Sequence, residues 1–288
     1  MLTSEAKDTV FNIKKTLNLK GNIIDLSTPV VMQILNITPD SFYPDSRVTT
    51  EAEILKKVER ALNQGATMLD VGGYSTRPGA AEITEAEELN RIINVIRLIE
   101  KNFPEAYVSI DTFRARVAYE AISAGACMIN DISGGQLDEN MFDTVAKLKV
   151  PYILMHMRGT PETMKSLNIY KNLLLDLMGF FHKSINKLIN LGVKDIVVDP
   201  GFGFAKSIDQ NYEILKNLKY FAILNAPVLI GISRKSMIYK RLNIPVSEAL
   251  NGTTVLNVMG LMNGASILRV HDTGEAMEAI KMFKNTFH

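Results

Sequence analysis

Three of the short apolar runs in the sequence end in a carboxylate or a carboxamide: Asp111, Asn130 and Asp199. A carboxylate accepts hydrogen bonds, and a carboxamide both accepts and donates them. Such a set could bind a planar heterocycle that presents adjacent ring N–H and amino donors, as a guanidine-like ring edge does. A single Asp or Asn after a strand is also common as a turn residue or helix N-cap, so the indication of a site comes from several together.

A second set of side chains carries positive charge or N–H donors: Arg77, Arg234, Lys235, Arg269 and His271. Such groups suit phosphate oxygens or a carboxylate. The formal net charge is only +1, which argues against nucleic acid or an anionic membrane as a partner, so a local cluster of donors indicates a small anionic ligand. Asn36 could supply an oxygen to Mg²⁺, which needs few protein ligands when phosphates are present.

Other chemistries find little support in the composition. The single cysteine, Cys127, excludes an intramolecular disulfide and any multi-cysteine zinc site, and its place at the start of an apolar run predicts a core residue. The opening residues MLTSEAKDTV do not resemble a signal peptide, and no uncharged apolar run is long enough for a membrane span. We therefore expect a reduced, cytoplasmic protein with no membrane partner.

A repeat of strand, loop and helix must position these side chains. Four times a helical pattern ends in Gly and passes into a short apolar run, at Gly65, Gly125, Gly192 and Gly264. Filling the intervals predicts eight strands, at 31–36, 67–71, 107–111, 128–131, 152–155, 195–199, 227–232 and 266–270. Amphipathic helical segments lie between them, from the one around Ile54–Leu62 through 84–101, 114–124, 138–148, 168–191, 208–218 and 247–263 to 273–285.

Eight such units in about 260 residues predict an α/β fold, a (β/α)8 TIM barrel that forms one domain over 1–288. A doubly wound open sheet is the alternative, weakened because no glycine-rich dinucleotide motif follows the first strand. Residues 10–28 alternate loosely around a Lys20–Gly21–Asn22 turn and predict a β-hairpin that closes the bottom of the barrel. Because catalytic groups of such barrels gather where strands end, the polar residues above are expected at one rim. The glycine-rich turns 72–79 and 201–203 are expected to be mobile.

The sequence also resembles the dihydropteroate synthase family. Eight segments follow that family's motifs in order: ILNITPDSF (34–42), GGYSTRPG (72–79), SIDT (109–112), INDISGG (129–135), LMHM (154–157), DPGFGFAKS (199–207), GISRKS (231–236) and LRVHD (268–272). They span residues 30–272. The resemblance implies a transferase of folate biosynthesis and a sulfonamide target. It would join para-aminobenzoate to 6-hydroxymethyl-7,8-dihydropterin diphosphate, release diphosphate, require Mg²⁺ and form a homodimer.

Residue roles follow from the same resemblance. The pterin is expected to contact Asp111, Asn130, Met155, Asp199, Phe204, Gly231 and Lys235. The diphosphate is expected on Asn36, Thr76, Arg269 and His271, with Asn36 on the metal. Para-aminobenzoate is expected near Phe42, Arg77, Pro78, Lys235 and Ser236. The catalytic set is then Asn36, Arg77, Asp111, Lys235, Arg269 and His271.

Two positions depart from the family pattern. Tyr74 stands where the family commonly has Glu, and the first loop reads SFYPDS rather than SFSDGG, so Asp45 matches the family's loop aspartate only after a one-residue shift. Two other readings stay open at this point. A methyltransferase acting on methyltetrahydrofolate could share the acidic pterin set, though it has no need of diphosphate cations. A catalytically silent pterin-binding protein is the second.

Overall fold

Eight parallel strands form the centre of the protein, whose computed structural model describes residues 14–37, 50–75 and 82–287. The strands are β3 (Val30–Asn36), β4 (Met68–Gly72), β5 (Tyr107–Asp111), β6 (Met128–Asp131), β7 (Tyr152–Met155), β8 (Ile196–Asp199), β9 (Leu229–Ile230) and β10 (Ile267–Val270). They run in the order β8-β7-β6-β5-β4-β3-β10-β9. A parallel bridge from Val198 to Val228 joins the two outer strands, and the Val198 N–H donates to the Pro227 carbonyl at 2.9 Å. The sheet thus closes, which confirms the predicted (β/α)8 barrel.

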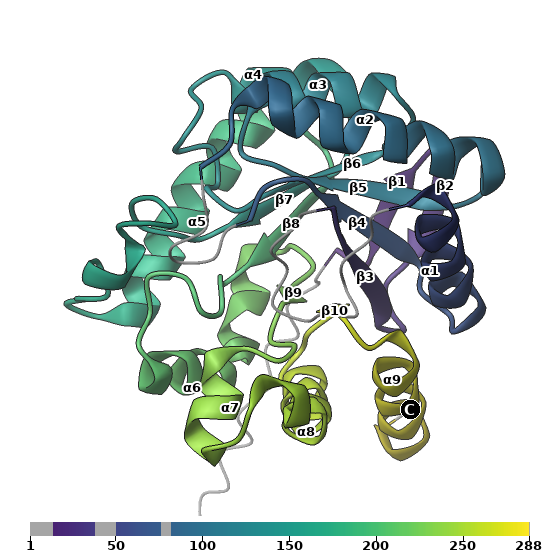
Figure 1. Cartoon of the computed structure of the whole chain (residues 1–288). Coiled ribbons are helices and arrows are strands. Elements are labelled where there is room, and N and C mark those ends of the chain that lie inside the picture. Colours follow the sequence, from purple (N-terminus) through teal and green to yellow (C-terminus); the bar gives the residue numbers. More distant parts are fainter. Residues whose placement is uncertain (1–13, 38–49, 76–81, 288) are drawn as a thin grey trace, which may run out of the picture.

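Helices cover the outside of the strands (Figure 1). They are α1 (Glu51–Asn63), α2 (Glu85–Asn102), α3 (Ala115–Ser123), α4 (Met141–Leu148), α5 (Leu173–Asn190), α6 (Ile208–Lys216), α7 (Ser236–Leu242), α8 (Leu250–Met262) and α9 (Thr273–Phe287). In the described part of the chain, short 3-10 turns accompany them: η2 (Met164–Ser166), η3 (Leu218–Leu224) and η4 (Val246–Glu248). Most bounds agree with the prediction to within a few residues.

One helix begins later than the apolar pattern suggested. The expected segment 168–191 contains α5, which begins at Leu173 because Asn172 caps it by accepting a hydrogen bond from the Leu175 N–H. By contrast, α1 and α2 begin at capping boxes set by Thr50 and Thr84, each with a Glu three residues later. At the other ends, Gly65 and Gly125 adopt φ of +98° and +121°, which confirms that glycine turns these helices back into strands.

The N-terminal hairpin plugs one end of the barrel. It consists of β1 (Thr16–Leu19) and β2 (Asn22–Asp25), joined through the turn residues Lys20 and Gly21, which both have positive φ. Leu17, Leu19 and Leu26 pack against the residues at which the barrel strands begin. We call this group the hairpin cluster: Leu17, Leu19, Leu26, Met32, Met68, Cys127, Met128, Ile153, Val197, Leu229 and Ile267. The predicted closure is confirmed, and Cys127 is a core residue as expected.

Candidate active site at the C-terminal ends of the strands

A cavity of about 540 Å³ lies where the strands end. Eight of the predicted site residues border it: Asn36, Asp111, Phe204, Gly231, Lys235, Ser236, Arg269 and His271. They come from five different strand ends and loops, as expected for a barrel whose site lies on its C-terminal face. The strand-end rule therefore named residues that border one cavity, and their roles in ligand binding stay a prediction.

A group of polar residues at this end of the barrel follows from the two-residue period of the strands. Met68, Met128, Val197 and Ile267 belong to the hairpin cluster. Two residues further along the same strands are Asp70, Asn130, Asp199 and Arg269, which point to the same side because side chains alternate across a strand. We call these four residues the polar layer. Each of the four strands thus contributes an apolar side chain near its start and a polar one near its end.

Arg269 holds the polar layer together. Its Nε donates to Asp70 Oδ2 at 2.6 Å, and its terminal nitrogen donates to Asp111 Oδ2 at 2.6 Å. The Asp70 side chain is fully buried, and those of Asp111 and Arg269 are nearly so. Burial alone would lower the pKa of Arg269, but Asp70 and Asp111 outweigh burial and raise it. The guanidinium stays charged and keeps further N–H groups for another anion.

The pKa values of Asp111 and Asp199 differ from those of ordinary surface carboxylates. Burial raises the pKa of Asp111 to about 7, although Arg269 opposes the shift. Burial also raises the pKa of Asp199, against the nearby ammonium of Lys235, and Asp199 Oδ1 accepts a hydrogen bond from the Gly201 N–H at 2.7 Å. Buried carboxylates with perturbed pKa values beside a cavity are typical of functional sites.

Lys235 faces these carboxylates from the loop after β9. Its Nζ donates to the Phe202 carbonyl and lies 4.8 Å from the centre of the Phe204 ring. Burial lowers the pKa of Lys235 to about 8, which Asp199 partly offsets. The backbone of Lys235 caps α7, so Ser236 begins that helix as predicted.

Asn130, Met155 and Asp199 belong to the predicted pterin set but are not among the residues that border the cavity. The Asn130 Nδ2 donates to Asp70 Oδ2 at 2.9 Å, which fixes the orientation of the amide. Its Oδ1 is buried and has no hydrogen-bond partner among the described residues, so it can accept from a ligand donor. Met155 belongs to a small apolar group with Ile132 and Met157, and Phe204 packs against it.

The comparisons with known proteins agree with this geometry. The profile of the family described as "Pterin binding enzyme" matches residues 32–271. The dihydropteroate synthase of Haemophilus influenzae is 40% identical over 265 residues, 91% of this chain and 96% of that protein. That of Clostridium beijerinckii is 43% identical over 255 residues, 88% of this chain and 92% of that protein. The chain belongs to the dihydropteroate synthase family.

Solved structures of the family show the same fold. The Yersinia pestis dihydropteroate synthase in complex with a sulfonamide drug superposes with a TM-score of 0.90 at 39% identity, covering 94% of this chain and 98% of that one. The Xanthomonas albilineans enzyme with 4-aminobenzoic acid gives a TM-score of 0.86 at 34% identity, again over 94% and 98%. Both cover nearly the whole barrel.

Two members of the expected cationic set differ from that expectation. Arg234 makes a two-point ion pair with Asp272, at 2.9 and 3.0 Å, and also donates to the Ser247 carbonyl at 2.6 Å. The Arg234 guanidinium therefore joins Asp272 to the Ser247 carbonyl and has a structural role instead of binding an anion. Burial and the charge of Arg269 lower the pKa of His271 to about 3, so this imidazole is neutral at pH 7. In this dihydropteroate synthase family member, His271 can offer a neutral N–H but no charge.

Four predicted ligand residues, Phe42, Thr76, Arg77 and Pro78, lie outside the described residues, as does Asp45. Tyr74, the residue in place of the family's usual Glu, is described and borders the cavity. Its ring meets Phe113 edge to face at 5.1 Å, and the Arg114 guanidinium lies 5.4 Å from its centre. Burial raises the pKa of Tyr74, so the phenol is protonated at pH 7. An uncharged aromatic side chain thus occupies this position.

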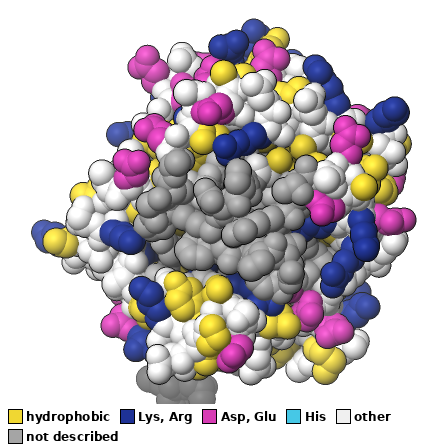
Figure 2. Space-filling view, viewed as in Figure 1, with side chains coloured by type: hydrophobic (Ala, Val, Ile, Leu, Met, Phe, Trp, Pro, Cys, Tyr) yellow, Lys and Arg dark blue, Asp and Glu magenta, His cyan; other side chains and the backbone are white. Residues whose placement is uncertain are grey.

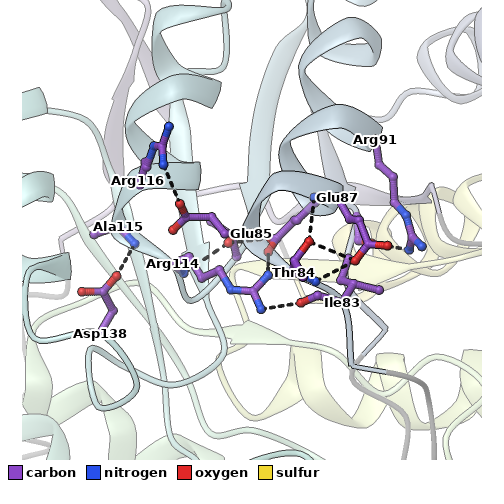
Figure 3. Close-up of polar contacts among 12 residues, drawn as sticks. Ile83, Thr84, Glu85, Glu87, Arg91, Arg114, Ala115, Arg116 and Asp138 are labelled. Atoms are coloured by element: carbon purple, nitrogen blue, oxygen red, sulfur yellow. Dashed lines mark hydrogen bonds and ion pairs between the residues drawn. The ribbon is translucent and has the colours of Figure 1, made fainter.

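Arg114, which lies against the Tyr74 ring, is itself held by hydrogen bonds. It donates to Glu88 Oε2 at 2.5 Å and to the Ile83 carbonyl at 2.7 Å, and Figure 3 shows the second contact among neighbouring polar contacts of α2 and α3. Thr112 donates to the other Glu88 oxygen at 2.7 Å. The fully buried Glu88 therefore has both oxygens paired, which offsets part of the cost of burying its charge, although burial still raises its pKa.

The search by strand ends missed two groups near the site. Asp70 is not among the predicted site residues, although it orients both Arg269 and Asn130. Lys206 was quoted within the DPGFGFAKS motif and assigned no role, yet it borders the cavity. The two-residue spacing from Met68 could have indicated Asp70, whereas Lys206 lies in a loop that has no such period.

Three further findings concern metal ligands, membrane-spanning helices and surface charge. Among residues 14–37, 50–75 and 82–287, no group of three or more His, Cys, Asp or Glu could hold a metal ion by itself. None of the helices described is both long and apolar enough to cross a membrane. On the face drawn in Figure 2, Lys and Arg side chains are interspersed with Asp and Glu over the described residues, in keeping with the net charge of +1.

Proposed function

We propose that the protein joins the amino group of para-aminobenzoate to the methylene carbon of 6-hydroxymethyl-7,8-dihydropterin diphosphate. This makes it a transferase of an alkyl or aryl group other than methyl, acting in folate biosynthesis. The observation that carries the proposal is the Asp70–Arg269–Asp111 bridge beside Lys235, in one cavity of a chain whose relatives are dihydropteroate synthases. It brings acceptors for a ring and donors for an anion within one site.

The polar layer and its neighbours suit the pterin ring. Asn130 Oδ1 and the carboxylates of Asp111 and Asp199 offer acceptors for ring N–H and amino groups. The Lys235 ammonium offers a donor, and Phe204 and Met155 offer apolar contact with a ring face. The same carboxylates favour positive charge that develops on the ring as the diphosphate departs.

Stabilising the leaving group is the main chemical task. A primary carbon attached to an electron-rich dihydropterin can lose diphosphate with cation-like character, and an arylamine is nucleophilic at pH 7 without a strong base. Arg269 retains N–H groups beyond the two that Asp70 and Asp111 accept, and these can bind departing phosphate oxygens. His271 adds a neutral N–H donor beside them.

The residues present fit a magnesium ion that arrives with the substrate. Asn36 borders the cavity and offers one hard carboxamide oxygen, and an ion bound by diphosphate needs few protein ligands. When bound, Mg²⁺ would neutralise charge on the leaving diphosphate. Asn36 would hold that ion in the cavity that Arg269 also borders.

The rim should hold para-aminobenzoate. Ser236 begins α7 beside Lys235, and both border the cavity. Arg77, Pro78, Phe42 and Thr76 retain their proposed roles in the aminobenzoate and diphosphate sites. Tyr74 supplies an aromatic surface on the same side of the cavity mouth as Phe113 and Arg114. The 4-aminobenzoic acid complex of the Xanthomonas albilineans relative supports this choice of second substrate.

Product formation from purified protein tests the proposal. With both substrates and Mg²⁺, we expect dihydropteroate and diphosphate in equal amounts, measured by chromatography and a diphosphate assay. Omitting para-aminobenzoate or chelating Mg²⁺ should remove the pteroate signal, and the Asp199→Asn variant serves as the protein control. Diphosphate release without pteroate would contradict the proposal.

The same experiment separates the two alternatives. A methyltransferase would transfer the methyl group of methyltetrahydrofolate and would be indifferent to sulfonamides. A silent binding protein would bind the pterin and form no product. Inhibition by a sulfonamide that para-aminobenzoate relieves is expected here, and the sulfonamide complex of the Yersinia pestis relative supports it.

We further propose that the protein acts in the cytoplasm as a homodimer. The outward face of α8 carries the exposed side chains of Val255, Met259 and Met262. The helix sequence LNGTTVLNVMGLM has no charged residue, which suits burial against a second copy. Sedimentation should give twice the chain mass, and Met259→Lys should shift it toward the monomer.

A further inference from the structure

Lys206 places its ammonium among converging acceptors. Its Nζ donates to the backbone carbonyls of His156 at 3.2 Å, Gly201 at 3.1 Å and Phe204 at 2.9 Å, and lies 3.1 Å from His156 Nδ1. An ammonium has three N–H groups, so these four acceptors use all of its donors. Lys206 therefore ties the end of β7 to the loop that follows β8.

The backbone of residues 201–205 needs a hydrogen-bond donor of this kind. Gly201, Gly203 and Ala205 have φ of +74°, +83° and +48° within five residues. The left-handed conformation is unfavourable for an alanine, because its Cβ crowds the following carbonyl oxygen. A Cβ at Gly201 would lie 2.2 Å from the His156 carbonyl, so the chain passes directly against the end of β7. Carbonyl oxygens that converge in this way repel one another unless a donor stands between them.

His156 supplies a fixed acceptor for this tie. Burial and the charges of Lys206 and Arg158 lower the pKa of His156 to about 2, so its ring is neutral. Its Nδ1 can then accept from Lys206 while Nε2 carries the proton. The ring packs edge to face on Phe180 at 5.0 Å, which holds it in place.

The same loop delivers groups to the proposed pterin site. The Phe202 carbonyl accepts from Lys235 Nζ, and the Phe204 ring borders the cavity beneath that ammonium. Lys206 bonds to the carbonyl of Phe204 itself. The position of the Phe204 ring, and the partner of Lys235, therefore depend on how residues 201–205 are held.

We propose that Lys206 is a positioning residue for pterin binding, whose ammonium holds residues 201–205 so that Phe202 and Phe204 meet Lys235. This inference rests on the proposed function, since the ligand is the dihydropterin. Direct contact of Lys206 with the diphosphate is the competing role. The four acceptors already around the ammonium argue against it, since none of its N–H groups remains for a phosphate.

Two probes separate these roles: 6-hydroxymethylpterin and its diphosphate, each titrated by calorimetry. Lys206→Met removes the charge at similar side-chain length, and Lys216→Met, on the exposed end of α6, is the matched control. Because Lys206→Met removes the charged donor that holds residues 201–205, we expect affinity for both probes to fall by about 10-fold to 100-fold. The KM for para-aminobenzoate should change by less than about twofold, because the substitution alters the residues proposed to contact the pterin.

Chemical rescue tests the ammonium itself. In Lys206→Cys, the thiolate displaces bromide from 2-bromoethylamine and forms a thioether that restores an ammonium at the length of lysine. Burial raises the pKa of Cys127 to about 11, so that thiol stays unreactive. Aminoethylation should restore most of the pterin affinity, whereas iodoacetamide, which adds a neutral amide, should not.

Each outcome decides a different claim. Equal losses for the two probes, with rescue, support the proposal. A much larger loss for the diphosphate, or unchanged affinity in a folded Lys206→Met, overturns it. If Lys206→Met does not fold, Lys206→Gln, whose amide can still donate to two carbonyls, takes its place in the same comparison. Wild-type protein that binds neither probe would instead overturn the proposed function.

Discussion

At the N-terminal end of the barrel, Leu19, Met68 and Met128 are almost completely buried among other apolar side chains. Two residues further along β4 and β6, Asp70 and Asn130 are just as buried, yet each keeps an oxygen with no hydrogen-bond partner among the described residues. The side chains named at the two ends are thus equally buried. Among these described residues, those near the C-terminal end are the ones whose polar groups are incompletely paired.

This contrast separates stability from binding along the same strands. The hairpin cluster removes apolar surface from water, which stabilises the fold in proportion to the area buried. The polar layer gives up part of that stabilisation, since buried groups without partners cost free energy. A ligand that supplies the missing partners recovers this free energy as affinity. The two ends should therefore respond to substitution in opposite ways.

The largest effect is expected at Lys235. Lys235→Ala removes the ammonium that faces Asp199 and should lower pterin affinity by at least about 100-fold, as expected for a buried charged partner. The thermal midpoint should change little, because the substitution also removes a lysine whose charge is costly to bury. Calorimetric titration and a thermal scan measure the two quantities, with Lys216→Ala as control. Pterin binding within threefold of wild type would show that Lys235 does not contact the ring.

The opposite response is expected at the hairpin. Leu19→Ala should lower the free energy of unfolding by about 2–5 kcal/mol, because it leaves a cavity beneath the barrel. The matched control is Ile23→Ala on the same hairpin, where the side chain is 66% exposed and little should change. Denaturant titration gives the stability, and kcat of the folded protein should stay at the wild-type value. A tenfold fall in kcat would mean that the two ends are coupled.

The sequence allowed the apolar end to be predicted well. Glycine at the end of four helical segments, with short apolar runs in the intervals between them, located all eight strands, because parallel strands covered on both faces need little else. The hairpin was recognised from its turn residues, and its packing followed from the alternation of Leu17 and Leu19. These are local rules, and the structure obeys them locally.

The polar end was predicted only in outline. Strand ends identified Asp111, Asp199 and Arg269, but not how they pair, since pairing depends on side-chain directions across strands that are far apart in sequence. His271 was expected to be cationic, and its neutral state follows from burial that only the closed barrel creates. Arg234 was expected at the ligand, but Asp272, five residues after β10 begins, holds it instead.

Asp70 tests whether the layer itself orients ligand groups. Asp70→Asn keeps the shape but weakens the pairing with Arg269 Nε and allows the Asn130 amide to turn. We expect kcat/KM to fall by about 10-fold to 100-fold, corresponding to roughly 1.4–2.7 kcal/mol of transition-state stabilisation. Ser109→Ala, at a neighbouring buried hydroxyl without a partner among the described residues, should cost far less. Equal effects of the two variants would contradict a special role for Asp70.

The pH dependence of pterin affinity should sharpen the same contrast. The pKa of Asp111 is about 7 and that of Lys235 about 8, so affinity should rise as Asp111 ionises and fall as Lys235 loses its proton. Lys206, whose pKa burial lowers to about 7, reinforces the alkaline fall. Affinity should be greatest near pH 7, where Asp111 is becoming ionised and Lys206 and Lys235 still hold protons, and each group should contribute a decrease of up to about tenfold per pH unit on its side of the maximum. Leu19→Ala should shift neither limb, and a flat profile would contradict the assignment.

The smallest effect is expected at Tyr74, which borders the cavity and belongs to neither the hairpin cluster nor the polar layer. Tyr74→Phe keeps the edge contact with Phe113 and the contact with Arg114 while removing only the hydroxyl, so kcat/KM should stay within about twofold of wild type. Tyr74→Ala loses the aromatic pair and should cost about 0.5–1.5 kcal/mol of stability. Tyr74→Glu, which restores the family's usual residue, would place a carboxylate near Arg114 but also near Glu82 and Glu88, so its gain and its cost should nearly cancel. A tenfold loss in Tyr74→Phe would show that the hydroxyl touches the reacting groups, and the rim would then have to be counted with the polar layer.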